Sequence, residues 1–160
     1  MKQLLFLLLT FTIIANAQQS PTENSIAEND NKIYRSTEVE LKPQLKEGVY
    51  TISLFISDKF KFPVAIKNKK ITIFSSFVIE KDGSMTDVKA FYIKIKDLVE
   101  SNIKKAKTSD EKINELDEIE TMKAETVRVL SQFKATWTPA LKYGRPVRCL
   151  YNLPLNFSVE

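Results

Sequence analysis

The last stretch of the chain, "GRPVRCLYNLPLNF" (residues 144–157), alternates between apolar and polar side chains. The apolar residues of one parity are Val147, Cys149, Tyr151, Leu153, Leu155 and Phe157. Arg148, Asn152 and Asn156 have the other parity, and a period of two is typical of a half-buried β-strand. Pro154 lies inside the run and cannot donate a backbone hydrogen bond, which sheets tolerate on edge strands and at bulges. We therefore predict a long C-terminal strand at the edge of a sheet.

A β-hairpin is predicted upstream of this strand. Ile71, Ile73, Phe77 and Ile79 alternate in "ITIFSSFVI", with Ser75 as the exception. Asp82-Gly83 then forms a strong hairpin-turn signal between two patterned runs. The returning strand is expected over 85–95, with Val88, Ala90 and Tyr92 on one face. Glu80, Asp82 and Asp87 lack the spacing of an EF-hand, so we interpret these carboxylates as part of a solvated turn.

A first helix is favoured between Pro43 and Pro63. Leu45, Val49, Ile52 and Ile56 follow one another at helical spacing, although the β-branched residues around them leave a strand as the alternative. The helix is expected to end before Pro63, because proline restricts the residue that precedes it.

A second, longer helix is predicted to end near Phe133. The charged segment 96–120 is expected to begin with a short helix, and Ser109-Asp110 offers an N-cap for the longer one. Its core-facing residues are Ile119, Met122, Thr126, Val129, Leu130 and Phe133. The order of elements predicts an α+β fold in which two helices cover one face of an antiparallel sheet.

The N-terminal residues have the form of a targeting segment. Lys2 precedes the apolar run "LLFLLLTFTII", and small residues follow at Ala15 and Ala17. These features predict a secretory signal peptide over residues 1–17. An uncleaved membrane anchor is the alternative, but the apolar run is short for a hydrocarbon core of about 30 Å. Residues 18–32 are polar and are interpreted as a disordered tether, and residues 33–160 as one domain.

Composition excludes several classes of chemistry. The 160 residues contain no histidine, which excludes a Ser-His-Asp arrangement and a histidine-ligated zinc site. Cys149 is the only cysteine and is interpreted as a small buried hydrophobe, and Trp137 as a core anchor. The formal net charge of +4 is modest for nucleic-acid binding. No catalytic residue, metal, cofactor or small-molecule substrate is predicted.

Four stretches, in order, resemble the C-terminal domain of the TonB family, especially its Bacteroidetes-type versions. They are "KFP" (61–63), "FVIEKDGSMTDVKAF" (77–91), "ETVRVLSQFKATWTPALKYGRPVR" (125–148) and "YNLPLNF" (151–157). The resemblance covers residues 33–160. This chain departs from the family in the turn before the first helix, in the approach to the first strand and in a longer segment between hairpin and helix.

The resemblance implies a three-stranded antiparallel sheet whose last strand captures the TonB box, an extended segment of an outer-membrane transporter. Capture of this kind is β-augmentation, in which the unpaired backbone groups of an edge strand bond to a guest strand. In this chain the partner-binding residues would be Gly144, Arg145, Val147, Arg148, Cys149, Leu150, Tyr151, Asn152, Leu153 and Asn156. Gly144 and Arg145 would lie in the preceding turn, and Arg148, Asn152 and Asn156 would face solvent or the guest.

Several functions stay open from the sequence. The leading hypothesis is an exported, periplasmic binding module without a membrane helix of its own. A minimal energy transducer, anchored in the inner membrane by an uncleaved N-terminus, is the alternative. The same edge could instead join two copies of the chain, as a homodimer. A hydrolase that uses Glu125 or Asp87 is disfavoured, because these carboxylates have no convergent pattern.

Overall fold

The computed structural model describes residues 31–98 and 108–160. The strands are β1 (Ile33–Arg35), β2 (Gln44–Leu45), β3 (Lys69–Ile79), β4 (Met85–Asp97), β5 (Trp137–Thr138), β6 (Ala140–Lys142) and β7 (Arg145–Val159). The helices are α2 (Val49–Lys59) and α3 (Ser109–Gln132). The predicted signal peptide, and all but the last two residues of the predicted tether, lie outside the described residues.

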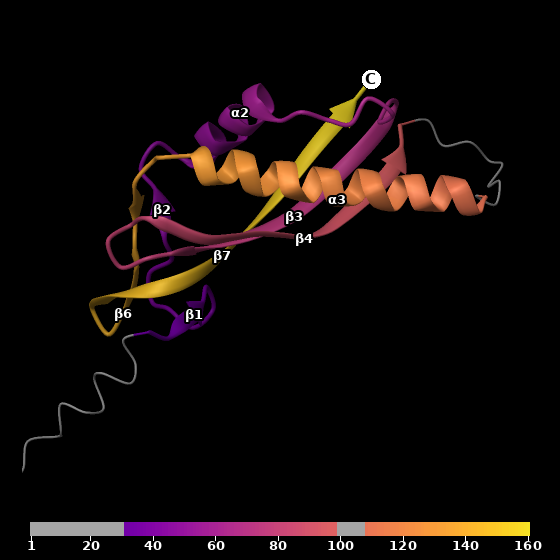
Figure 1. The fold of residues 1–160 in the computed structure, drawn as a ribbon. Helices are drawn as coiled ribbons and strands as arrows, with labels where there is room; N and C mark the ends of the chain where they lie inside the picture. The colour runs from indigo at the N-terminus through magenta and orange to yellow at the C-terminus, as the bar shows by residue number, and fades with distance from the viewer. Residues whose placement is uncertain (1–30, 99–107) are drawn as a thin grey trace, which may run out of the picture. The chain divides into compact units, whose positions relative to one another are not determined.

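The main sheet places the C-terminal strand in its interior. Its order is β1-β7-β3-β4, and β6 pairs with β7 as a fifth strand (Figure 1). β1 runs parallel to β7, whereas the pairs β7–β3, β3–β4 and β6–β7 are antiparallel. The α+β class is thus confirmed. The expected three-stranded antiparallel sheet is wrong as a description of the whole, because β1 and β6 extend it and β1 makes it mixed.

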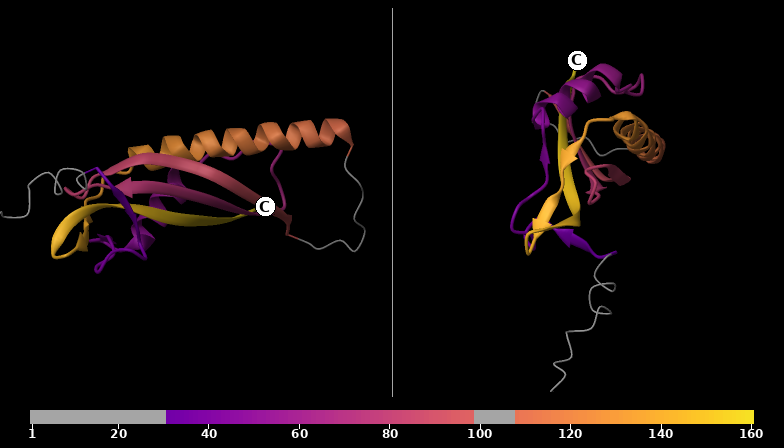
Figure 2. Two further views of the ribbon diagram at one scale, coloured as in Figure 1. Left: turned by 90° about the horizontal axis from the view of Figure 1, so that it is seen from below. Right: turned by 90° about the vertical axis from the view of Figure 1, so that its left-hand side faces the viewer.

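Both helices contribute buried apolar residues to one core. Ile52 and Ile56 of α2 and Met122, Val129 and Leu130 of α3 belong to the same buried cluster. The odd-numbered residues of β3 and β7 complete this cluster, which contains Ile71, Ile73, Phe77, Ile79, Leu153 and Leu155. α3 runs along one side of the strands (Figure 2). No helix in residues 31–98 and 108–160 is long and apolar enough to span a membrane.

The second helix matches its predicted apolar stripe and differs at its start. Met122, Thr126, Val129 and Leu130 are buried, and Ile119 and Phe133 pack against the core. The N-cap is Thr108 rather than Ser109-Asp110. The Thr108 side chain accepts a hydrogen bond from the backbone of Glu111, whose carboxylate accepts one from the Thr108 backbone. This capping box satisfies two otherwise unpaired N–H groups.

The first helix is shorter than the apolar pattern suggested. It begins at Val49, and its predicted end before Pro63 is confirmed at Lys59. Leu45 does not belong to the helix but lies in β2, paired with Trp137 of β5. Gly48, with a φ of 82°, turns the chain from this extended segment into α2. The apolar spacing looked like one continuous helix because the short strand β2 is followed closely by α2.

The β3–β4 hairpin is confirmed, although its pairing shifts register twice and the shift at Phe91 changes the facing of Tyr92. β4 extends from Met85 to Asp97, so it occupies the start of the segment where a short helix was expected. Its pairing with β3 shifts register at Phe91, between Phe74↔Tyr92 and Ser75↔Ala90. An extra residue in one strand makes the side chains that follow it point to the opposite face of the sheet. Val88 and Ala90 therefore pack on the core as predicted, whereas Tyr92 is exposed and Ile93 is buried.

Candidate strand-addition site

The two sides of β7 differ in how fully they are paired. Along one side, β3 pairs with Cys149–Val159 without a register shift. On the other side, which we call the outer side, β1 pairs with Arg148–Leu150. Within the part of the chain that the structure describes, no strand pairs with the outer side from Tyr151 to Val159. We call Arg148–Leu150 the covered half of β7 and Tyr151–Val159 its free half.

The backbone groups of the free half that face outward belong to even-numbered residues. The Ser75 hydroxyl donates a 2.7 Å hydrogen bond to the carbonyl oxygen of Leu153, which places that carbonyl toward β3. Because facing alternates along a strand, the backbone groups of Asn152, Pro154, Asn156 and Ser158 point to the outer side. Pro154 is in register with Phe74 within the continuous β3–β7 ladder. Its missing N–H therefore costs the outer side a donor and leaves the pairing with β3 intact.

The apolar side chains of one parity hold β7 to the core. Cys149, Leu153 and Leu155 are buried, and Tyr151 stacks on Phe77, with ring centroids 5.3 Å apart. The Tyr151 ring also lies 4.8 Å from that of Trp137, which is buried and confirmed as a core anchor. Cys149 is confirmed as a buried residue, and burial raises the pKa of its thiol. The side chains of Cys149 and Leu153 therefore cannot contact a guest, although both were predicted as partner-binding residues.

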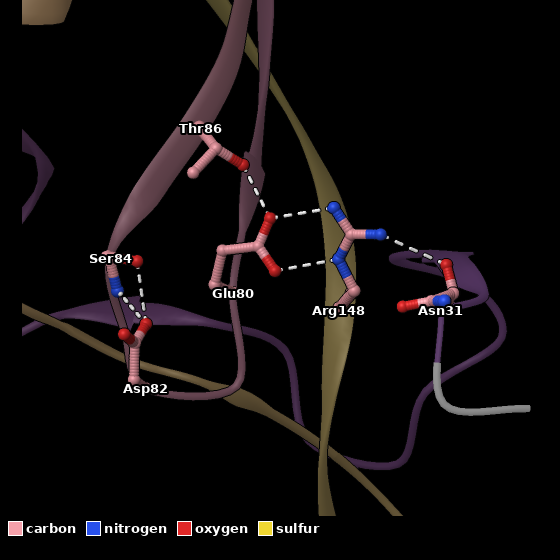
Figure 3. A network of polar contacts seen from close by, with 6 residues as sticks. All are labelled: Asn31, Glu80, Asp82, Ser84, Thr86 and Arg148. Carbon is pink, nitrogen blue, oxygen red and sulfur yellow. Dashed lines mark hydrogen bonds and ion pairs between the residues drawn. The ribbon is translucent and has the colours of Figure 1, made fainter. Parts of the chain in front are cut away.

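Arg148 corrects a second expectation, since its side chain is engaged rather than free. Its guanidinium donates to both carboxylate oxygens of Glu80, at 2.7 and 2.8 Å, and to the backbone oxygen of Asn31 at 3.0 Å (Figure 3). Thr86 donates a further hydrogen bond to Glu80. The hydrogen bonds from Arg148 are the main reason why the pKa of Glu80 lies below its ordinary value of 4.5. Arg148 thus ties β7 to the hairpin and to the start of β1.

The predicted turn residues Gly144 and Arg145 lie where β6 joins β7. Tyr143 and Gly144 have φ angles of 51° and 69° and form the two-residue turn, and Arg145 pairs with Lys142. The Tyr143 backbone N–H donates to Glu40 at 3.0 Å, so the turn is held by the N-terminal segment. Val147 pairs with Ala140, and Leu150 lies beside β1, so neither belongs to the free half. Of the predicted residues, Tyr151, Asn152, Leu153 and Asn156 lie in the free half.

An aromatic cluster that the sequence analysis did not identify flanks the free half. Phe60 and Phe62, which follow α2, each lie 5.1 Å from the ring of Phe157, and their own centroids are 4.7 Å apart. Phe60 is buried, whereas Phe62 and Phe157 are half-buried and keep part of their surface exposed. The "KFP" motif was the available signal, although its spacing alone does not place it beside residue 157.

Within residues 31–98 and 108–160, no group of three or more acidic or cysteine side chains could hold a metal ion. Comparisons with family models, curated proteins and solved structures found no significant match to this chain.

Proposed function

We propose that this domain captures an extended segment of a partner protein by adding it as a strand to the free half of β7. The partner is a TonB-dependent outer-membrane transporter and the segment is its TonB box, as the family resemblance implies. The protein acts in the periplasm as a binding module and not as an enzyme. Its binding links it to TonB-dependent transport.

The single observation that carries this proposal is the outer side of Tyr151–Val159. An edge strand presents unpaired N–H and C=O groups that template a further strand. The neighbouring Arg148–Leu150 already accepts β1, in parallel orientation, on the same side. The backbone of β7 is therefore shaped to pair on this side, and the free half continues the surface on which β1 ends.

The surrounding fold supports the family assignment within the same proposal. The antiparallel strands β7, β3 and β4 and two helices in one core are the arrangement that the resemblance implies. The strands β1 and β6 are additions to that arrangement.

The geometry predicts features of the guest. Asn152, Asn156 and Ser158 each offer an outward N–H, whereas Pro154 offers only a carbonyl. A guest strand therefore lacks one backbone partner opposite Pro154. Its side chains on the helix side would lie next to Phe62 and Phe157, which favours apolar residues there.

The proposal can be tested by pull-down of TonB-box peptides from outer-membrane transporters with the full chain. The variant with Asn152→Pro and Asn156→Pro removes two outward donors and is expected to weaken capture at least about tenfold, at roughly 1 kcal/mol for each hydrogen bond. The control variant with Asn152→Ala and Asn156→Ala keeps both N–H groups and should bind like the wild type. Prolines at Cys149 and Tyr151 are unsuitable, because the donors at these positions face β3.

Two results would contradict strand addition here. One is unchanged capture by the double proline variant, and the other is equal loss in the proline and alanine variants. If the proline variant instead abolishes a concentration-dependent dimer and no peptide binds, the edge serves self-association. The mass of the protein isolated from cells separates the exported module from the anchored energy transducer, because only the latter keeps residues 1–17.

A further inference from the structure

The sheet face opposite the core carries a regular array of side chains on β7, β3 and β4. Cross-strand register places four rows on this face: Asn152–Ser76–Lys89, Pro154–Phe74–Tyr92, Asn156–Thr72–Lys94 and Ser158–Lys70–Lys96. We call these rows, together with Phe91 at the bulge, the outer face. Apart from Ser76, Phe74 and Thr72 on the middle strand, all of these side chains are exposed.

The centre of the outer face is apolar. Tyr92 and Phe91 are 55% and 56% exposed, and both rings contact Phe74, with centroid distances of 5.6 and 6.4 Å. Pro154 continues this row toward β7. Exposed aromatic side chains that touch one another on an open sheet face form an apolar patch, which is typical of an interaction surface.

Lysines flank this centre on both sides, and none of the residues in the four rows is acidic. Lys89 is paired with Asp87 at 2.8 Å, and Lys96 also borders a cavity of about 470 Å³ that Glu111, Glu115 and Glu118 line. Lys70 and Lys94 make no ion pair within residues 31–98 and 108–160. These two lysines therefore carry the unbalanced positive charge of the outer face.

The arrangement favours a partner whose negative charge is spread over a surface. The basic residues are lysines, which act as point charges, and no arginine is present for bidentate recognition of single phosphates. The Phe74 ring is tilted by 35° and 43° from those of Tyr92 and Phe91, so the three rings do not form one plane for stacking a base or a sugar. Of the two cavities described, one reaches the outer face only at Lys96 and the other does not reach it, so neither offers a socket in the apolar centre for the anchoring side chain of a protein partner.

From these observations we infer that the outer face docks on an anionic lipid bilayer. Phe91 and Tyr92 enter the headgroup region, where aromatic rings partition well, and Lys70 and Lys94 lie against the negative surface. The face is distinct from the backbone groups of the free half, so this inference does not depend on strand capture.

Vesicle sedimentation tests the inference with the full chain. Vesicles of phosphatidylglycerol and phosphatidylcholine should bind it, and binding should fall with added salt, whereas pure phosphatidylcholine should bind it far less. The variant with Lys70→Gln and Lys94→Gln should partition roughly 25-fold more weakly, at about fivefold per lysine. The variant with Phe91→Ser and Tyr92→Ser should also lose binding. Residues 1–30 are the same in every variant, so their own lipid affinity cancels.

A matched control keeps the test specific. Lys46→Gln with Lys67→Gln removes the same charge from two exposed lysines outside the outer face and should bind like the wild type. Equal loss in both lysine pairs would overturn the inference, because the net charge of the chain would then explain binding. The inference would also be overturned if the wild-type chain did not bind anionic vesicles. It would be overturned as well if the chain formed a dimer that the variant with Phe91→Ser and Tyr92→Ser disrupts. Capture of transporter peptides should be unchanged in Lys70→Gln with Lys94→Gln, which separates this test from that of the proposed function.

Discussion

The covered and free halves of β7 belong to one strand, yet they are held in different ways. The covered half is tied by polar contacts, in which Arg148 bonds to Glu80 and Asn31 and the strand pairs with β1. The free half pairs on one side only and depends on apolar contacts, including those of Phe157 with Phe60 and Phe62. The covered half is paired with a neighbouring strand on both sides. The free half packs its apolar side chains on the core but leaves the backbone groups of its outer side available for a guest strand.

The largest effect on this comparison is expected at Gly83, whose carbonyl accepts a 3.1 Å hydrogen bond from the Trp137 backbone. A Cβ at Gly83 would lie 2.1 Å from the carbonyl oxygen of Trp137, whose ring contacts Tyr151. Gly83 also has a φ of 83°. Gly83→Ala combines backbone strain with a steric clash and should lower the free energy of unfolding by roughly 3 kcal/mol.

Urea denaturation measures this loss, and Gly144→Ala is the matched control. Gly144 has a similar φ of 69°, but nothing lies within 4 Å of an added Cβ. Gly144→Ala should lower the free energy of unfolding by about 1 kcal/mol, because only the backbone conformation disfavours alanine there. Equal losses at the two glycines would show that the contact with Trp137 adds nothing.

A smaller effect is expected from Phe157→Ala in the free half. This change removes two aromatic contacts from a half-buried side chain and should lower the free energy of unfolding by about 2 kcal/mol, less than for a fully buried phenylalanine. Hydrogen exchange should then increase in residues 155–159 and much less in residues 148–150. Uniform exchange along β7 would argue against the independence of its two halves.

Arg148→Ala should have the smallest of the three effects, about 1.5 kcal/mol, because it leaves the partly buried Glu80 without its cation. The pKa of Glu80 is depressed in the folded protein, so the stabilisation is present above the unfolded pKa and is lost as pH falls through the folded value. Unfolding measured from neutral to acidic pH should therefore show a shallower acid-side loss in the variant.

The exposed pair Lys89–Asp87 on the same hairpin is the control for this measurement. Its side chains are 64% and 47% exposed, and Lys89→Ala should change stability by less than about 0.5 kcal/mol. If Arg148→Ala and Lys89→Ala changed the free energy of unfolding equally at every pH, the covered half would not depend on the ion pair between Arg148 and Glu80.

The sequence predicted well where apolar periodicity continued over many residues. The stripe of α3 and the alternation of β7 were read correctly, because each pattern repeats several times on one buried face. The hairpin was found from Asp82-Gly83, and Cys149 and Trp137 were assigned correctly to the interior.

The errors arose where structure depends on residues far apart in the chain. β1 and β2 are three and two residues long, too short for a period, and no element was predicted for residues 33–42. Without β1, β7 was taken for an edge along its whole length, and Arg148 for a solvated side chain. The facing of Tyr92 was wrong because a one-residue bulge leaves no mark in the alternation before it.

The position of β7 has a consequence for how the chain folds. β7 pairs with β1 near its start and with β3 along most of its length, and Arg148 contacts Asn31 across 117 positions of sequence. Closing such a long loop is entropically costly, and folds dominated by distant pairings form slowly. During synthesis, β3 and β4 can pair early, but the sheet cannot close until β7 has left the ribosome. The sheet of this domain is therefore incomplete until β7 is available, and the loss of this one strand would separate β1 and β6 from β3 and β4.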